Sequence, residues 1–429
     1  MGKFRVMRKL AIFFILAGAA LQAFPQATDE YAADLQSGAA ATGNKFNAVG
    51  SWRGVFELRP GIEVPFNFEI KNGRDNSPEL YFRNDTELFD GGRVRQTTDS
   101  LFIPLNQFDN ELAFQINGEA LSGVLRRQDG SGQPLALTAT PATNWRFRES
   151  SVTPAGDISG TYAVTFTGSN GREEKTVGIF RQQGARLTAT FLRVTGDSRY
   201  LEGTVEADSF RLSGFIGSGP SFYIGVVGPD GNLSGQSVGV RGGTPFIGIR
   251  DPNAKLPDAY SLTYLREGYT SLDFSFPDAD GHAVSLKDPK YRDKVVVVAI
   301  GGTWCPNCID ETAFLAPWYR ANRSRGIEVI SIQYERQTDP AFVHKVLTRN
   351  RQRYDIQYDQ LFGGINDKQA VAASLPALNT FLAFPTTIFI DRQGKVAKIH
   401  TGFAGPATGK YYDEFIKEFN EEVDNLHKQ

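Results

Sequence analysis

The two cysteines of this 429-residue chain stand only two residues apart, in the run Trp304-Cys305-Pro306-Asn307-Cys308. Two thiols with this spacing at the start of a helix lie close enough to form a disulfide. A helix N-terminus also offers free N–H groups and a positive dipole end, which stabilise a thiolate on the first cysteine. Because the thiolate attacks in thiol–disulfide exchange, the pair predicts redox chemistry with Cys305 as nucleophile and Cys308 as resolving thiol.

The neighbouring sequence supplies a strand and a helix to position this pair. Lys294 to Ile300 is a continuous apolar run rich in valine, which is typical of a strand buried on both faces of a sheet. Gly301-Gly302-Thr303 ends this run. We expect a helix after the cysteines, and Pro317 should kink or end it. The predicted order is strand, turn, Cys-x-x-Cys and helix.

Zinc binding and a structural disulfide are the alternatives for this pair. Zinc needs two further ligands, but there is no second cysteine pair, and the histidines lack ligand spacing: His282, His344, His400 and His427. A disulfide across two residues closes too short a loop to constrain the unfolded chain strongly. We therefore expect a redox pair and no metal site.

From about Phe274 onward, the chain resembles the TlpA-like family of extracytoplasmic thiol–disulfide oxidoreductases. Three features carry this resemblance: residues 276–286 look like the family's entry hairpin, the strand with Trp-Cys-Pro-Asn-Cys follows, and Phe384-Pro385-Thr386-Thr387 comes later. The resemblance implies a thioredoxin-like α/β domain at residues 271–429. The amphipathic stretch 411–426 should be its closing helix, after helices at 340–353 and 368–378 and strands at 327–332 and 395–399.

The resemblance also implies site residues around the cysteines. Pro385 should be cis and lie against them, where it would guide a substrate strand. Phe384 could hydrogen-bond the extended backbone of a substrate, and Trp304 should also contact it. From the residues alone, Pro385 is a proline that leads a strand, for which trans is the usual state.

Glu311 is the remaining catalytic candidate. TlpA-like reductases often carry a glutamate three residues beyond the second cysteine, and it would exchange a proton as Cys308 attacks the mixed disulfide. Alternatively, Glu311 and Asp310 only favour the first helical turn through its dipole. Ala299 stands where ordinary thioredoxins have a buried aspartate, which strengthens the case for Glu311. Gly301-Gly302 replaces an aromatic residue and alanine of many relatives, and we expect it to loosen the turn.

The first 27 residues have the layout of a secretory signal peptide. Lys3, Arg5, Arg8 and Lys9 precede an apolar stretch from Leu10 to Ala23, which is short for a membrane span. Cleavage after Ala27 would release a soluble chain into the periplasm or another extracytoplasmic envelope compartment. An uncleaved N-terminal anchor is the alternative. Loss of these four cations would move the formal net charge from −2 to −6, which argues against nucleic acid or an anionic membrane as partner.

Residues 45–250 predict antiparallel β-structure, in a sandwich or barrel, because glycine is dense and apolar residues alternate with polar ones between turns. A weak repeat points to two units, since Trp52 and Tyr162 stand 110 residues apart in similar surroundings. Leu121-Ser122-Gly123 likewise recurs 112 residues later as Leu233-Ser234-Gly235. We predict a multidomain chain with β-rich domains at 28–149 and 150–254 and a linker at 255–270. A single larger β-domain is the alternative.

Two short segments receive local interpretations. Thr195-Gly196-Asp197-Ser198-Arg199-Tyr200 should be a hairpin corner whose Asp197 and Arg199 pair with one another or with backbone. Tyr334-Glu335 should close a strand near the edge where substrates approach, with Glu335 in solvent, as is usual for glutamate.

These features predict an extracytoplasmic thiol–disulfide oxidoreductase, and the family resemblance favours reduction over oxidation. Its substrates would be disulfide-containing proteins. It would need a membrane-embedded electron donor, because the chain carries no cofactor motif. Two other classes stay open. One is a thiol peroxidase, which uses a single peroxidatic cysteine; the other is an envelope binding protein whose β-domains capture a glycan or protein ligand.

Overall fold

The computed structural model describes residues 46–141, 145–147 and 152–429. The expected signal peptide at 1–27 and the expected domain boundary at 149–150 lie outside the described residues. Residues Phe46–Gln429 form one compact unit. Within the described ranges, no helix combines the length and the apolar character that a membrane crossing requires.

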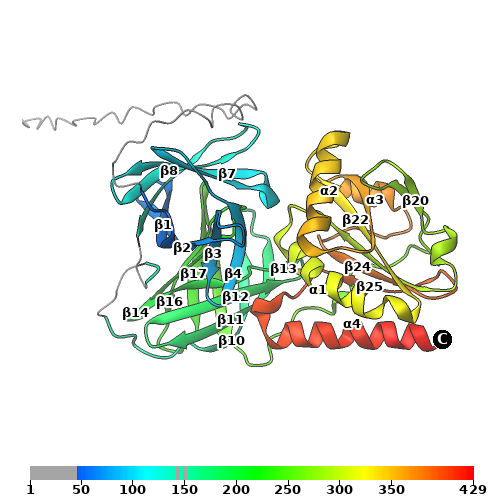
Figure 1. Ribbon diagram of the computed structural model, residues 1–429. Helices are drawn as coiled ribbons and strands as arrows, with labels where there is room; N and C mark the ends of the chain where they lie inside the picture. The colour runs from blue at the N-terminus through cyan, green and yellow to red at the C-terminus, as the bar shows by residue number, and fades with distance from the viewer. Residues whose placement is uncertain (1–45, 142–144, 148–151) are drawn as a thin grey trace, which may run out of the picture. The chain divides into compact units, whose positions relative to one another are not determined.

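The first sheet is an antiparallel meander, drawn in blue to cyan in Figure 1. Its strand order is β4-β3-β2-β1-β9-β8-β7-β6-β5, so the first strand lies between the second and the last. Buried phenylalanines such as Phe56, Phe66 and Phe82 fill its core. The strands are β1 (Gly50–Arg59), β2 (Ile62–Asn72), β3 (Pro78–Asn84), β4 (Glu87–Arg93), β5 (Arg95–Gln96), β6 (Ser100–Leu105), β7 (Asn110–Asn117), β8 (Ala120–Arg127) and β9 (Leu135–Pro141).

The second sheet is also antiparallel, and its pairings close on themselves. The ring runs β10-β11-β12-β14-β15-β16-β17-β18 and returns to β10, which makes it barrel-like. Phe166, Phe180 and Phe191 are buried in its core. The strands are β10 (Gly160–Thr167), β11 (Glu173–Gln183), β12 (Arg186–Arg193), β13 (Gly196–Asp197), β14 (Leu201–Glu206), β15 (Ser209–Gly214), β16 (Ser221–Val227), β17 (Leu233–Gly239) and β18 (Gly242–Arg250).

The two sheets begin in the same way. Trp52 in β1 donates its ring N–H to the carbonyl of Ala48, and Tyr162 in β10 donates its hydroxyl to the carbonyl of Ile158, in both cases four residues earlier. The repeated Leu-Ser-Gly tripeptides lie in β8 and β17, each of which pairs with the last strand of its own sheet. We propose on this basis that the sheets are repeated units, named module 1 (residues 46–141) and module 2 (residues 152–254).

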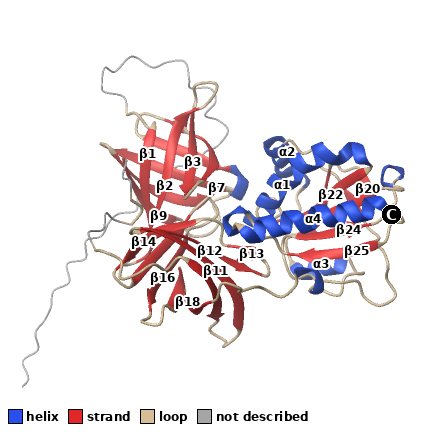
Figure 2. Ribbon diagram, turned by 90° about the horizontal axis from the view of Figure 1, so that it is seen from below, coloured by secondary structure: helices blue, strands red, loops and turns tan. Residues whose placement is uncertain are grey.

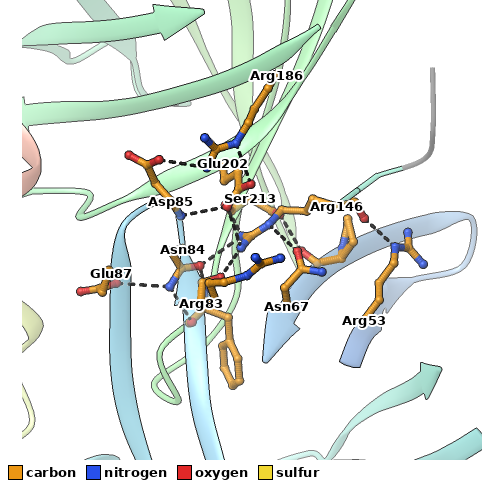
Figure 3. A network of polar contacts seen from close by, with 12 residues as sticks. Arg53, Asn67, Arg83, Asn84, Asp85, Glu87, Arg146, Arg186, Glu202 and Ser213 are labelled. Atoms are coloured by element: carbon orange, nitrogen blue, oxygen red, sulfur yellow. Dashed lines mark hydrogen bonds and ion pairs between the residues drawn. The ribbon is translucent and has the colours of Figure 1, made fainter. Parts of the chain in front are cut away.

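A buried arginine in the connection between the modules joins them (Figure 3). Arg146 donates to the side-chain oxygens of Asn67 and Asn84 in module 1, at 3.2 and 3.1 Å. It also donates to the carbonyl of Ser213 in module 2, at 2.9 Å, and forms an ion pair with Glu202 at 3.5 Å. Burial lowers the pKa of Arg146 to about 10, and Glu202 opposes this shift. The arginine therefore remains charged at neutral pH and bonds to both modules.

The C-terminal part is thioredoxin-like, with strand order β23-β22-β21-β24-β25. β21 is parallel to β22 and antiparallel to β24. Helices α1 and α4 pack on one face of this sheet and α3 on the other, and Figure 2 shows helices on both sides. The elements are β19 (Ser275–Pro277), β20 (Ala283–Ser285), β21 (Val295–Gly301), α1 (Pro306–Asn322), β22 (Ile327–Glu335), α2 (Pro340–Tyr354), β23 (Asp359–Ile365), α3 (Lys368–Ser374), β24 (Thr386–Ile390), β25 (Val396–Thr401) and α4 (Lys410–Lys428).

The expected fold class, an all-β N-terminal region with a thioredoxin-like domain, is confirmed, but one helix end was predicted wrongly. At Pro317, where we expected a kink or an end, α1 does not end, because Leu315 and Tyr319 on either side of it are buried against the sheet, and this packing offsets the missing N–H. α3 ends at Ser374 rather than at residue 378. The next residue, Leu375, precedes a proline, and the proline ring makes helical backbone angles unfavourable for the residue before it.

Candidate functional site

The two thiols lie where a buried strand passes into a helix. Every residue of β21 is buried, and α1 begins directly after Cys305, which is the extended N-cap residue. The backbone N–H of Cys308 donates to the sulfur of Cys305 at 3.4 Å. Both thiols are free, with exposed fractions of 5% for Cys305 and 4% for Cys308. The first sulfur therefore receives a helix N-terminal N–H, which is the arrangement that stabilises a thiolate.

Glu311 is buried in the same helix. Its carboxylate accepts a hydrogen bond from the Thr387 hydroxyl at 2.5 Å. Burial raises the pKa of Glu311 to about 7, and the bond from Thr387 opposes the shift. Burial also raises the pKa of the Cys308 thiol, and the neighbouring Cys305 and the charge of Glu311 raise it further. A buried carboxyl with a pKa near 7 can exchange a proton at neutral pH. The alternative role in the first helical turn fits less well, because the first turn of α1 contains no acidic residue.

The loop before β24 reaches the first cysteine. The Phe384–Pro385 peptide is cis, as the resemblance implies. The thiol of Cys305 donates to the carbonyl oxygen of Phe384 at 3.6 Å. The N–H of Gly402 donates to the carbonyl of Pro385 at 2.9 Å. The fold therefore brings the Phe384–Pro385 pair beside Cys305, although the pair follows it by about eighty residues in the chain.

Trp304 packs beside the same loop. Its ring lies edge-on to Phe384, with 5.6 Å between ring centroids, and its N–H donates to the carbonyl of Tyr334 at 2.8 Å. A Cβ on Gly302 would lie 2.3 Å from the Trp304 ring nitrogen and 2.7 Å from the Tyr334 carbonyl oxygen. Gly302 therefore makes room for the Trp304 ring.

Glu335 is the residue that local sequence reasoning missed most clearly. It was expected in solvent, but it is 1% exposed. Its carboxylate accepts hydrogen bonds from the backbone N–H and the hydroxyl of Thr303, at 2.8 and 3.0 Å. Burial raises the pKa of Glu335 to about 7, and the bonds from Thr303 oppose the shift. Glu335 thus fixes the turn that leads into the cysteines, and no local pattern in the sequence signals this contact.

Comparison with known proteins places this domain in a family. Residues 268–399 match the AhpC/TSA family. Over 141 residues the chain is 30% identical to the thiol-disulfide oxidoreductase ResA of Geobacillus kaustophilus. This aligned stretch covers 33% of this chain and 72% of that protein. The chain belongs to the ResA-like thiol-disulfide oxidoreductases. ResA of Bacillus subtilis is 27% identical over 138 residues, 32% of this chain and 69% of that protein. We refer to residues 268–429 as the ResA-like domain.

Solved structures similar to the ResA-like domain include two bacterial proteins. A thiol:disulfide interchange protein from Chlorobium tepidum is 19% identical, with 38% of this chain and 98% of that chain covered and a TM-score of 0.29. A thiol-disulfide oxidoreductase from Bacteroides fragilis is 17% identical, with 34% and 99% covered and a TM-score of 0.26.

Both modules contact the turn that carries the cysteines in the ResA-like domain. In module 1, Gln107 from the short 3-10 helix η2 (Asn106–Phe108) donates to the carbonyl of Thr303 at 2.6 Å. In module 2, Arg199 donates to the carbonyl of Pro306 at 2.9 Å. The prediction that Asp197 and Arg199 pair with one another or with backbone is confirmed for the backbone: the Asp197 carboxylate accepts the backbone N–H of Arg199 at 2.5 Å, and the Arg199 guanidinium donates to the Pro306 carbonyl.

Proposed function

We propose that this chain is an extracytoplasmic enzyme that reduces disulfide bonds of envelope proteins through Cys305 and Cys308. One observation carries the proposal: the Cys305 sulfur accepts the N–H of Cys308 at the start of α1, with the second thiol buried behind it. The signal-peptide layout of residues 1–27 supports export to the periplasm or a similar compartment.

The proposed reaction moves two electrons from the dithiol to the client. The Cys305 thiolate attacks one sulfur of the client disulfide, the client S–S bond breaks, and the other client sulfur leaves as a thiolate. Cys308 then gives up its proton and attacks the Cys305 sulfur, which releases the second client thiolate. The enzyme ends as the Cys305–Cys308 disulfide, and the client thiolates take up two protons.

Glu311, Pro385 and the two aromatic residues have supporting roles in this proposal. The Glu311 carboxylate accepts the proton that Cys308 loses, because a group with a pKa near 7 can take and return a proton at neutral pH. Pro385 and Phe384 guide an extended strand of the client past Cys305, and Trp304 flanks that strand. A membrane-embedded electron donor then returns the Cys305–Cys308 disulfide to the dithiol.

The test combines trapping with an equilibrium measurement. The Cys308→Ser variant should accumulate a mixed disulfide between Cys305 and a model client, and the Cys305→Ser variant should accumulate none. Equilibration with glutathione should give a potential near about −270 mV for a reductant, whereas about −120 mV would indicate an oxidant. Catalytic consumption of peroxide would instead support a thiol peroxidase. Failure to trap any client would leave a binding protein as the better interpretation.

A further inference from the structure

One guanidinium joins module 1, module 2 and the cysteine turn. Arg199, at the corner after β13, forms an ion pair with Asp310 of α1 at 2.6 Å and another with Glu87 of module 1 at 2.5 Å. The nitrogen that contacts Asp310 also donates to the carbonyl oxygen of Pro306, the residue directly after Cys305. The Arg199 side chain is 11% exposed, so these contacts form largely out of water.

The corner that carries Arg199 fits closely against the ResA-like domain. The Asp197 carboxylate accepts the backbone N–H of Gly405 at 2.6 Å, and the Asp197 N–H donates to the side-chain oxygen of Asn307 at 3.2 Å. A Cβ on Gly196 would lie 2.2 Å from the amide nitrogen of Asn307, and a Cβ on Gly402 would lie 2.1 Å from the carbonyl oxygen of Val194. Glycines on both sides thus allow a backbone approach that other residues would block.

At this contact, a single guanidinium faces several carboxyl groups. Asp197, Glu87 and Asp310 bring carboxyl groups around Arg199. Burial raises the pKa of Asp310 to about 7, although Arg199 opposes the shift. Burial lowers the pKa of Arg199, but Asp310 and Glu87 more than offset this, so the guanidinium stays charged. Without this cation, the acids beside the first turns of α1 would lack their compensating charge.

We propose that Arg199 is a positioning residue for the dithiol: it holds the Pro306 carbonyl and neutralises Asp310, and module 2 thereby sets the reduction potential of the Cys305–Cys308 couple. This inference rests on the proposed function and deepens it. Arg199 touches neither sulfur but acts through the turn and through Asp310. A module with no thiol of its own then controls how readily the ResA-like domain gives up electrons.

The direction of the effect follows from charge. A nearby cation favours a thiolate over a neutral sulfur, so it stabilises the reduced couple. Arg199→Gln removes this cation and leaves the carboxyl groups of Asp310 and Glu87 beside the turn. The dithiol of the variant should therefore be oxidised more easily than that of the wild type.

The experiment measures the equilibrium constant of the couple with glutathione in the full-length protein. Arg199→Gln should shift this constant about tenfold toward the enzyme disulfide, which corresponds to ~30 mV. Arg199→Lys keeps the charge and should restore most of the wild-type value. Arg211→Gln is the matched control, because Arg211 is another arginine of module 2 and its ion pair, at 2.9 Å, is with Glu206 of the same module. This control should leave the constant unchanged.

The outcomes separate the inference from the function on which it rests. A wild-type couple that never equilibrates with glutathione would contradict the proposed function itself. An unchanged constant in a folded Arg199→Gln protein, or an equal shift in Arg211→Gln, would overturn the role of Arg199. If Arg199→Gln does not fold, Asp310→Asn tests the same pair. It removes a negative charge and should shift the constant in the opposite direction, and an unchanged constant there would equally overturn the inference.

Discussion

Arg199 donates to the carbonyl oxygen of Pro306 across 107 residues of chain. On the other side of the cysteines, Gln107 donates to the carbonyl of Thr303. Both donors belong to parts of the chain that precede residue 268, where the AhpC/TSA match begins. The environment of this dithiol therefore depends on residues outside the matched family region, and its reduction potential has to be measured on the whole chain.

Glu311→Gln should slow the second step of disulfide reduction. The amide keeps the bond from Thr387 but cannot take the proton of Cys308, so release of the client should fall by about a hundredfold. In the wild type, release should rise with pH around pH 7, where the Glu311 carboxyl loses its proton, and the variant should lack this inflection. Single-turnover release from a preformed mixed disulfide at several pH values is the measurement. Glu421→Gln, on the exposed face of α4, is the control.

The same substitution should change how stability depends on pH. The pKa of Glu311 is about 7 in the folded chain and near 4.5 when unfolded, so the folded state binds more protons between these values. This group therefore makes the free energy of unfolding fall as pH rises from about 4.5 to 7, by about 3 kcal/mol in total. Relative to wild type, Glu311→Gln should be more stable at pH 8 than at pH 5 in urea unfolding. An identical difference at both pH values would rule out the shifted pKa.

Arg146→Met should destabilise the two modules strongly. It removes the buried guanidinium that bonds Asn67 and Asn84 and pairs with Glu202, and breaking such a buried network costs about 3–5 kcal/mol. Arg186→Gln is a matched control, since Arg186 pairs with the same Glu202 but is 46% exposed and should cost less than about 1 kcal/mol. Urea unfolding of both variants measures the difference. Equal losses would show that burial of Arg146 is not what matters.

Gly302→Ala should impair catalysis more than folding. The new methyl group would overlap the ring nitrogen of Trp304 and the carbonyl of Tyr334, so the Trp304 ring must leave its present position against Phe384. We expect the rate of disulfide reduction to fall at least about tenfold, because small displacements at a reacting centre are costly. Gly219→Ala is the control, since nothing lies within 4 Å of a Cβ at that position. A rate for Gly302→Ala that matches this control would refute the packing argument.

Local patterns predicted the elements of the ResA-like domain because their signals are contiguous in the chain. The valine run gave β21, and the apolar stripe with Phe415 and Phe419 gave α4. The early end of α3 was also predictable, since a proline follows Leu375. In each case the deciding residues are near neighbours in sequence.

The surroundings of the dithiol were less predictable because they depend on distant residues. Glu335 is far from Thr303 in sequence, and its burial is evident only once β22 lies beside β21. The sequence around Arg199 correctly predicted a turn, but the ion-pair partners of Arg199, Glu87 and Asp310, come from two other parts of the fold. Composition and spacing carry no information about such pairs.

The confinement of both cysteines to a single turn has a consequence for experiments on this protein. Neither module offers a sulfur that Cys305 could attack, so the chain cannot become trapped in a covalent link to its own β-strands. Any higher-mass, reductant-sensitive band on a gel must therefore contain a second molecule. The Cys308→Ser variant, whose single thiol cannot release a bound client, is thus a clean bait for identifying physiological clients.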